Sequence, residues 1–347
     1  MSNTQLEPRP SAMRREARES GEAVARFLET NTATLEKLAE RLRQSPPSVV
    51  VTCARGSSDH AATYGKYLIE TLVGVPVASA APSVTSVYAT EFRQTDALVI
   101  AISQSGRSPD LLATVQRYKD AGAYVVALVN DESSPLAAMA DTLLPLCAGP
   151  ETSVAATKSF ITSLAGLVAL TAHWSKDQRL LSAIASLPAM LDMAFELDWD
   201  PVVKALVDAR NLFIIGRGYG LSITQEAALK LKETCGLHAE GFSSAEVRHG
   251  PMAIIDAGFP ILAFATSDDA GDDVRKAAGE FAERGANVLL ADAKRQTAGG
   301  LPALATHPVL EPLLMIQSFY SAAEALAHSR GLDPDVPPFL RKVTETR

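Results

Sequence analysis

Short apolar runs alternate with amphipathic segments along most of this chain, and turns rich in glycine and polar residues separate them. In the first half, apolar runs predict strands at residues 49–51, 75–78, 97–100, 124–129 and 143–146. Helical patterns cover residues 13–43, 61–72, the segment after Pro109 and residues 135–140. Strands that are apolar throughout and alternate with helices indicate an α/β fold, in which helices cover both faces of a parallel sheet.

The second half repeats the spacing of turn residues found in the first half. The matching positions are Arg55-Gly56 with Arg217-Gly218, Gly74 with Gly236, and Ser105 with Ser267, each 162 residues apart (217 − 55 = 162). Gly122-Ala123 and Gly285-Ala286 match with one further residue. We therefore predict two tandem α/β domains, each a mainly parallel five-stranded sheet flanked by helices in a flavodoxin-like three-layer sandwich. The helical, aliphatic residues 151–200 would link them.

One strand-to-helix turn of the first copy carries a concentration of hydroxyl groups. Ser103, Gln104, Ser105, Gly106 and Ser108 follow the apolar run 97–100. Pro109 suits the first helical position and Ser108 the N-cap. Backbone N–H groups at a helix start attract anions, so this turn predicts a phosphate cradle, although an ordinary serine-rich loop has the same composition.

The second copy differs at the equivalent turn. Asp268 and Asp269 follow Ser267 there, and the glycine is missing. Two adjacent carboxylates repel a phosphate, so we expect a phosphate site in the first copy alone.

Composition narrows the class of protein. The net charge of −8 and the lack of a Lys/Arg block give no general attraction to nucleic acid or acidic membranes. Cys53, Cys147 and Cys235 are scattered, which argues against a zinc site or disulfides and favours a reducing compartment. With no apolar run of membrane-spanning length and no signal-peptide pattern, we expect a cytoplasmic protein.

Several ordered stretches together identify a resemblance to the SIS (sugar isomerase) family, in particular to the two-domain isomerase half of glucosamine-6-phosphate synthases. They are Gly56-Ser57-Ser58, Ser103-Gln104-Ser105-Gly106, Val154-Ala155-Ala156-Thr157-Lys158, Glu226 to Glu233, His238-Ala239-Glu240 and Arg248-His249-Gly250-Pro251. The resemblance implies SIS domains at 46–175 and 201–330. The remaining parts are an N-terminal tail and helix (1–45), a helical linker (176–200) and a C-terminal tail that closes the active site (331–347).

The resemblance also implies roles for individual residues. The residues implied to bind a sugar phosphate are Ser58, Ser103, Gln104, Ser105, Gly106, Ser108, Val154 and Lys158. Glu233 is implied to move a proton between C1 and C2, work that suits a carboxylate, with Lys230 and Lys232 keeping it ionised. His249 is implied to open the sugar ring in the partner subunit of a homodimer. Lys342 is implied to bring an amine to the carbonyl, to form an imine or stabilise an oxyanion.

Two residues depart from the synthase pattern, Arg341 and Ala156. About 45 residues precede the first predicted strand, so we expect no glutaminase domain and no nitrogen from glutamine. The same chemistry run toward ammonia release predicts a glucosamine-6-phosphate deaminase that needs no cofactor or metal. Isomerases or deaminases acting on epimeric sugar phosphates, and deglycases of fructosamine phosphates, remain open. A non-catalytic sugar-phosphate sensor is the alternative from another class.

Overall fold

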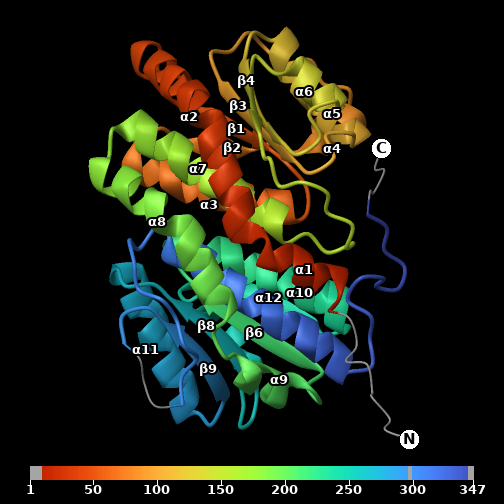
Figure 1. Cartoon of the computed structure of the whole chain (residues 1–347), viewed down its shortest axis with the longest axis vertical. Helices are drawn as coiled ribbons and strands as arrows, with labels where there is room; N and C mark the ends of the chain where they lie inside the picture. Colours follow the sequence, from red (N-terminus) through yellow and green to blue (C-terminus); the bar gives the residue numbers. More distant parts are fainter. Residues whose placement is uncertain (1–9, 296–298, 343–347) are drawn as a thin grey trace, which may run out of the picture.

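The computed structural model describes residues 10–295 and 299–342 (Figure 1). Its helices are α1 (Ala12–Arg18), α2 (Ser20–Gln44), α3 (Ser57–Leu72), α4 (Pro82–Ser86), α5 (Pro109–Asp120), α6 (Pro135–Met139), α7 (Lys158–Ser175), α8 (Gln178–Phe195), α9 (Asp200–Leu206), α10 (Leu221–Cys235), α11 (Asp269–Glu283) and α12 (Glu311–Ser329). Its strands are β1 (Val50–Cys53), β2 (Val77–Ser79), β3 (Leu98–Ser103), β4 (Tyr124–Val129), β5 (Thr142–Pro145), β6 (Asn211–Gly216), β7 (His238–Ser243), β8 (Pro260–Ala265) and β9 (Asn287–Asp292). Short 3₁₀ turns are η1 (Gly218–Gly220), η2 (Glu246–Arg248) and η3 (Pro251–Ile254).

The first half forms a parallel five-stranded sheet in the order β2-β1-β3-β4-β5. This order is the flavodoxin-like arrangement, and it confirms all five strands expected from the apolar runs. Strand ends are shifted by up to three residues from the predicted ones. The carboxyl ends of β1 and β3 lie side by side, which brings the turns after Cys53 and Ser103 together.

Side chains of the first sheet alternate between two apolar clusters, which explains why its strands are mostly apolar. Val50, Ile100 and Leu128 face one way, into the cluster that contains α2, α3 and α7. Val51 and Val99 face the other way, toward α5 and α6. Successive strand residues point to opposite faces of a sheet. When helices cover both faces, the strand sequence lacks the alternation of apolar and polar residues that a solvent-exposed face would produce.

The second half has a four-stranded parallel sheet in the order β7-β6-β8-β9, so the prediction of five strands in this copy was wrong for the described residues. At the place of a fifth strand a single parallel bridge joins Ala291 and Leu301. One bridge forms where the chain touches the sheet edge and leaves again, because Gly299 and Gly300 precede Leu301 and Pro302 follows it.

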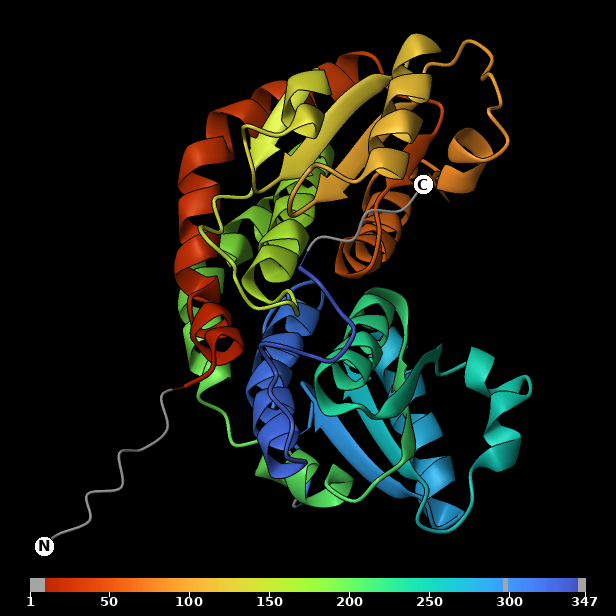
Figure 2. The same ribbon diagram turned by 90° about the vertical axis from the view of Figure 1, so that its right-hand side faces the viewer.

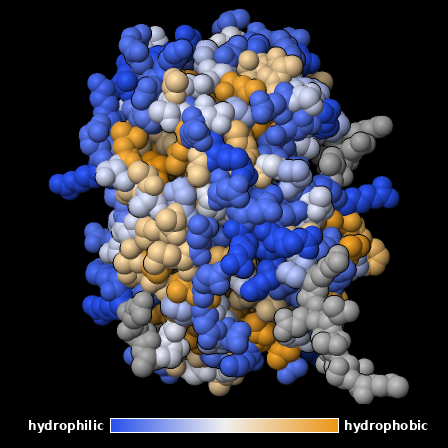
Figure 3. Space-filling model, in the orientation of Figure 1, coloured by the Kyte–Doolittle hydropathy of each residue, from blue (hydrophilic) through white to orange (hydrophobic). Residues whose placement is uncertain are grey.

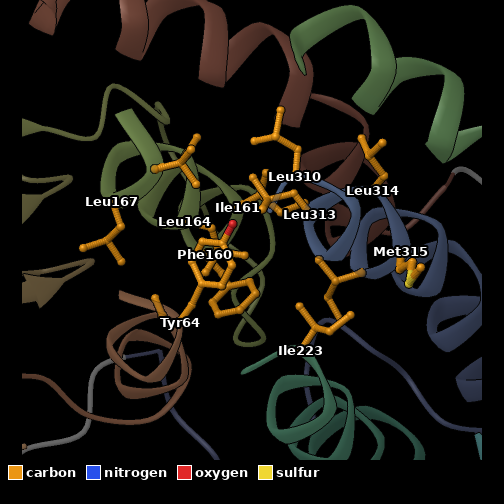
Figure 4. Packing of buried hydrophobic residues seen from close by; sticks show 14 of the residues in the cluster. Tyr64, Phe160, Ile161, Leu164, Leu167, Ile223, Leu310, Leu313, Leu314 and Met315 are labelled. Atoms are coloured by element: carbon orange, nitrogen blue, oxygen red, sulfur yellow. The ribbon is translucent and has the colours of Figure 1, made fainter. Parts of the chain in front are cut away.

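The inner faces of both sheets share one hydrophobic core. Figure 4 shows part of it, where Tyr64 of α3, Phe160 and Leu164 of α7, Ile223 of α10 and Leu313 of α12 point toward one another. α7 is buried on almost every side, and α10 and α12 pack together beneath it. Both halves therefore fold around common helices (Figure 1).

Two expectations for the helices need correction. The predicted N-terminal helix is divided at Glu19 into α1 and α2, where the Ser20 hydroxyl bonds to the carbonyl of Ala17. The helix predicted from residue 61 begins at Ser57. The predicted loose tail falls mostly on residues 1–9, and residues 343–347 of the predicted closing tail are likewise outside the described part.

The face seen in Figure 3 is mostly hydrophilic, with hydrophobic residues in separate patches. No single helix among the described residues has the length and hydrophobicity of a membrane span. Only α8 and α9 taken together reach that hydrophobicity, and a 52° bend separates them.

Candidate active site

A pocket of about 360 Å³ lies at the carboxyl ends of β1 and β3, where the β1–α3 and β3–α5 turns meet. In parallel α/β sheets ligands bind at this kind of position, the switch point of the strand order. The lining residues come from five segments of the chain. They are Arg55, Gly56, Ser57, Ser58, Ile102, Ser103, Gln104, Ser105, Ser108, Leu111, Val154, Ala156, Glu233, Leu340, Arg341 and Lys342.

The β3–α5 turn supplies the hydroxyl-rich wall of the pocket. Gly106 has φ +63°, and a Cβ there would lie 2.3 Å from the Ser134 hydroxyl, so glycine is required. The Gly106 N–H donates to the Ser103 hydroxyl at 2.9 Å and shapes the turn. α5 begins at Pro109 as predicted, yet the Ser108 side chain makes no capping hydrogen bond. The Ser108 hydroxyl is thus left to the pocket that it lines.

The β1–α3 turn supplies the neighbouring wall, with Ser57 and Ser58. The Ser57 hydroxyl donates to Glu226 Oε1 of α10 at 3.0 Å, whereas Ser58 makes no such bond within the described chain. Of these two hydroxyls, that of Ser58 is left to the pocket that it lines, and its part in binding a phosphate stays a prediction.

Glu233 enters the pocket from α10, in the other half. Its Oε2 accepts a hydrogen bond from Lys230 Nζ at 2.5 Å. Lys230 is buried, and burial alone would lower its pKa. The carboxylates of Glu226 and Glu233 outweigh burial and raise the pKa of Lys230, so the ammonium persists beside Glu233. The sequence had suggested both Lys230 and Lys232 as partners, but only Lys230 makes an ion pair with Glu233.

Glu226 joins the two halves beneath the pocket. Its buried carboxylate contacts Lys230 at 3.4 Å, the Tyr320 hydroxyl at 3.4 Å and His60 Nδ1 at 2.9 Å, besides Ser57. Burial would raise the pKa of Glu226, but Lys230, His60 and Ser57 outweigh it and hold the pKa below its ordinary value. This cluster links the β1–α3 turn to the helix that carries Glu233.

The C-terminal tail lines the pocket through Leu340, Arg341 and Lys342. Lys342 Nζ donates to the backbone oxygen of Ser153 at 2.6 Å and to Glu151 Oε2 at 3.2 Å. Farther back, the Asp335 carboxylate accepts from the N–H groups of Ala12 and Met13, at 2.6 and 2.8 Å, at the start of α1. Figure 2 shows the segment after α12 running back along that helix and ending between the two halves.

Glu151 is a fully buried carboxylate that meets the tail. It accepts from the N–H groups of Thr157 and Ser159, at 3.0 and 3.2 Å, and from the Ser159 hydroxyl at 2.6 Å. Burial would raise the pKa of Glu151, but Lys342 and these hydrogen bonds hold it below the ordinary value. Glu151 is therefore a buried anion that forms an ion pair with Lys342 of the tail.

Three predicted site residues do not line this pocket. Gly106 is buried behind the cradle and acts through its backbone conformation. Lys158 is only 1% exposed and bonds to Glu19, because it starts α7 and turns away from Val154. His249 is exposed between η2 and η3, with no pocket contact in its own chain, so its reach into a partner subunit stays a prediction.

Sequence reasoning had missed the buried partners of the site. Glu226 stood inside a recognised motif without a role, and Arg55 served only as a marker of the repeat. Glu151, three residues before Val154, gave no signal, since its burial depends on α7 and on the distant tail. No group of three His, Cys, Asp or Glu side chains placed to bind a metal occurs among residues 10–295 and 299–342.

Comparison with known proteins gives a consistent result. The model of the SIS domain matches residues 44–173 and 205–298. The glutamine–fructose-6-phosphate aminotransferase of Zymomonas mobilis is 34% identical over 319 residues, which are 87% of this chain and 52% of the relative. The enzyme of the same name from Thermococcus kodakarensis is 32% identical, over 96% of this chain and 58% of the relative. The chain thus spans little more than half the length of these relatives.

Solved structures show the same architecture. A protein from Silicibacter pomeroyi assigned as a phosphosugar isomerase has a TM-score of 0.89 and 45% identity, covering 94% of this chain and 100% of its own. The C-terminal domain of glucosamine-fructose-6-phosphate aminotransferase from Francisella tularensis has a TM-score of 0.84 and 26% identity, covering 97% and 100%. The glucosamine-6-phosphate deaminase of Thermotoga maritima shares the fold at a TM-score of 0.76 and 22% identity, covering 97% and 100%. With its domain model matched in both halves, the chain belongs to the SIS domain family.

Proposed function

We propose that this chain is an aminosugar-phosphate isomerase that acts as a glucosamine-6-phosphate deaminase. The observation that carries the proposal is that three kinds of chemical group line the same pocket. The hydroxyl groups at the starts of α3 and α5 suit a phosphate. Glu233 is a carboxylate paired with the ammonium of Lys230, and Lys342 offers an amine. The similarity to aminotransferases of fructose 6-phosphate supports an aminosugar phosphate as the substrate.

The reaction needs only side chains and water. After the sugar ring opens, Glu233 takes the proton from C2 of the amino-aldose and returns it to C1. A second proton passes from the amine nitrogen to O1, so that the aldehyde becomes a hydroxymethyl group and C2 carries an imine. Water adds to the imine carbon and ammonia leaves with its proton, which gives fructose 6-phosphate. Lys230 keeps Glu233 oriented and balances its charge before the first transfer and after the second.

The direct test is ammonia release from glucosamine 6-phosphate, with fructose 6-phosphate followed in parallel. We expect equal amounts of both products, and Glu233→Gln should lower turnover at least about a hundredfold while substrate still binds. Glu283→Gln, which changes an exposed carboxylate on α11, is the matched control and should keep full activity.

Three outcomes separate the alternatives. Ketose formation without ammonia from an epimeric sugar phosphate would replace the deaminase by an aldose–ketose isomerase. Release of a free amine from a fructosamine phosphate would indicate a deglycase. Tight sugar-phosphate binding with no turnover of any of these would indicate a sensor.

We further propose that the active form is a homodimer in which His249 completes the partner's pocket. Two inactive variants, Glu233→Gln and His249→Asn, should then complement each other when the chains are unfolded together and refolded. A mixed dimer has one pocket with both groups intact, so about a quarter of parental activity should return. If both groups act within one chain, every pocket lacks one of them and no activity returns.

A further inference from the structure

The predicted phosphate cradle contains no charged group, although its proposed ligand is a dianion. Ser58, Ser103, Gln104, Ser105 and Ser108 offer neutral donors. Hydrogen bonds from a cation to a phosphate are about twice as strong as neutral ones, and guanidinium matches phosphate geometry best. A cationic group beside this cradle is therefore worth identifying.

Arg55 lies at the right place. It is the second residue after β1, lines the pocket, and lies three residues before Ser58 at the start of α3. Its Nε and Nη2 donate to Asp110 Oδ2 at 3.0 and 2.7 Å. Asp110 is the second residue of α5, two positions after Ser108. The ion pair thus spans the two turns that form the cradle.

The two partners differ sharply in exposure. The Asp110 side chain is 1% exposed, whereas that of Arg55 is 52% exposed. Both donors on one edge of the guanidinium are engaged by Asp110, and Nη1 has no hydrogen-bond partner among residues 10–295 and 299–342. Asp110 also accepts the N–H of Leu111 at 2.8 Å through Oδ1, which fixes the carboxylate. The buried acid therefore orients the arginine and leaves one donor edge facing outward.

We propose that Arg55 is a substrate-binding residue whose guanidinium supplies the positive charge for the phosphate, and that Asp110 is the positioning residue that aims it. This inference rests on the proposed function for the identity of the ligand. The other cations of the pocket, Arg341 and Lys342, belong to the tail, and Lys342 already pairs with Glu151. Arg55 is the cation built into the cradle itself.

The repeat provides a matched control. Arg217 occupies the equivalent position in the second half, after β6, and pairs with Asp273 at 3.0 Å. Both partners of this second pair are exposed, at 40% and 46%, and neither lines the pocket. Arg217→Gln therefore removes an exposed Arg–Asp ion pair at the equivalent place in the fold, away from the pocket.

Calorimetric binding of glucosamine 6-phosphate, fructose 6-phosphate and inorganic phosphate tests the proposal without requiring turnover. Arg55→Gln should weaken binding of all three ligands about 10- to 100-fold, as expected for a lost charged hydrogen bond. Arg55→Lys should recover part of the affinity, because it keeps the charge but cannot engage Asp110 and a ligand at once. Where turnover is measurable, KM should rise and kcat should stay within about threefold. Arg217→Gln should bind as the parent does.

A purely structural Arg55 predicts the opposite pattern. Arg55→Gln would then lower the melting temperature and leave the affinity for inorganic phosphate unchanged, which would overturn the proposal. The double variant Arg55→Gln, Asp110→Asn removes both charges of the ion pair and keeps the test valid if the single variant does not fold. If no substrate turns over but phosphate binding still depends on Arg55, the proposed function fails and this inference stands.

Discussion

The two halves of the chain share a fold but differ at one equivalent turn, which follows β3 in the first half and β8 in the second. Gly56 and Gly218 have nearly equal φ values of +54° and +56°, which supports the repeat inferred from their spacing. In the first half the turn after β3 leaves its hydroxyls open to the pocket. In the second half the turn after β8 is occupied by carboxylates of the protein itself.

The occupants of the second turn are Asp268 and Glu311. Asp268 caps α11 by accepting from the N–H of Gly271 at 3.1 Å, and Glu311 Oε2 accepts from the N–H of Ser267 at 2.6 Å. The donors that would bind an anion are therefore used internally. The comparison teaches that the fold offers an anion site twice, and that the sequence decides whether a ligand or a side chain fills it.

Removing the Glu226 carboxylate, which links the two halves, should have the largest effect on stability. Glu226→Gln leaves Lys230 buried with a weaker set of partners and removes the carboxylate shared with Ser57 and His60. We expect the free energy of unfolding in urea to fall by about 3–5 kcal/mol. Glu22→Gln, which breaks the exposed pair with Arg26, should cost less than about 1 kcal/mol. Equal losses in both variants would refute the central role of Glu226.

Glycine substitutions should have unequal effects on stability in the turn after β3, which holds Gly106, and in the turn after β6, which holds Gly218. Gly106→Ala combines a positive φ with contacts to Ser134 and Val129 below 3 Å, so we expect a loss of about 2–4 kcal/mol. Gly218→Ala has the same backbone cost but meets only the Ala270 methyl group at 3.2 Å, and should lose about 1 kcal/mol. Thermal unfolding of both variants measures the difference. A larger loss for Gly218→Ala would contradict it.

Placing an aspartate in each turn tests which one binds the ligand. Ser105→Asp copies the acidic character of the second turn into the first, and should weaken binding of inorganic phosphate at least about tenfold by charge repulsion. Ser267→Asp is the matched change in the second half and should leave that affinity unaltered. The reverse result would move the phosphate site to the other half.

The acid dependence of stability should have opposite signs for two buried carboxylates. The pKa of Glu151 is lowered, so its stabilisation is present at neutral pH and is lost as pH falls below the ordinary glutamate value. Burial raises the pKa of Glu311, so its ionised form costs stability that is regained as pH falls through that raised pKa. Urea unfolding between pH 3 and 7 should show a flatter acid loss in Glu151→Gln and a steeper one in Glu311→Gln. The same slope in both would refute this assignment.

The sequence predicted the parts of the site that local pattern determines. The apolar run predicted the strand that leads to Ser103, and Pro109 predicted the start of the helix. The position of the turn between them was therefore predictable from the sequence. Lys158 was misplaced because it is near Val154 in sequence, while the start of α7 turns it toward Glu19. The ion pairs of Glu226 and Glu151 depend on contacts between distant segments, which no local pattern records.

The contact of Asp335 with the start of α1 has a consequence for the amine of Lys342. Because Asp335 holds the base of the tail, Lys342 stays tethered near the pocket even when its bonds to Glu151 and Ser153 are broken. A short tether keeps the local concentration of the amine high and limits the entropy lost when it is positioned. The start of α1 therefore limits how far Lys342 can lie from the pocket.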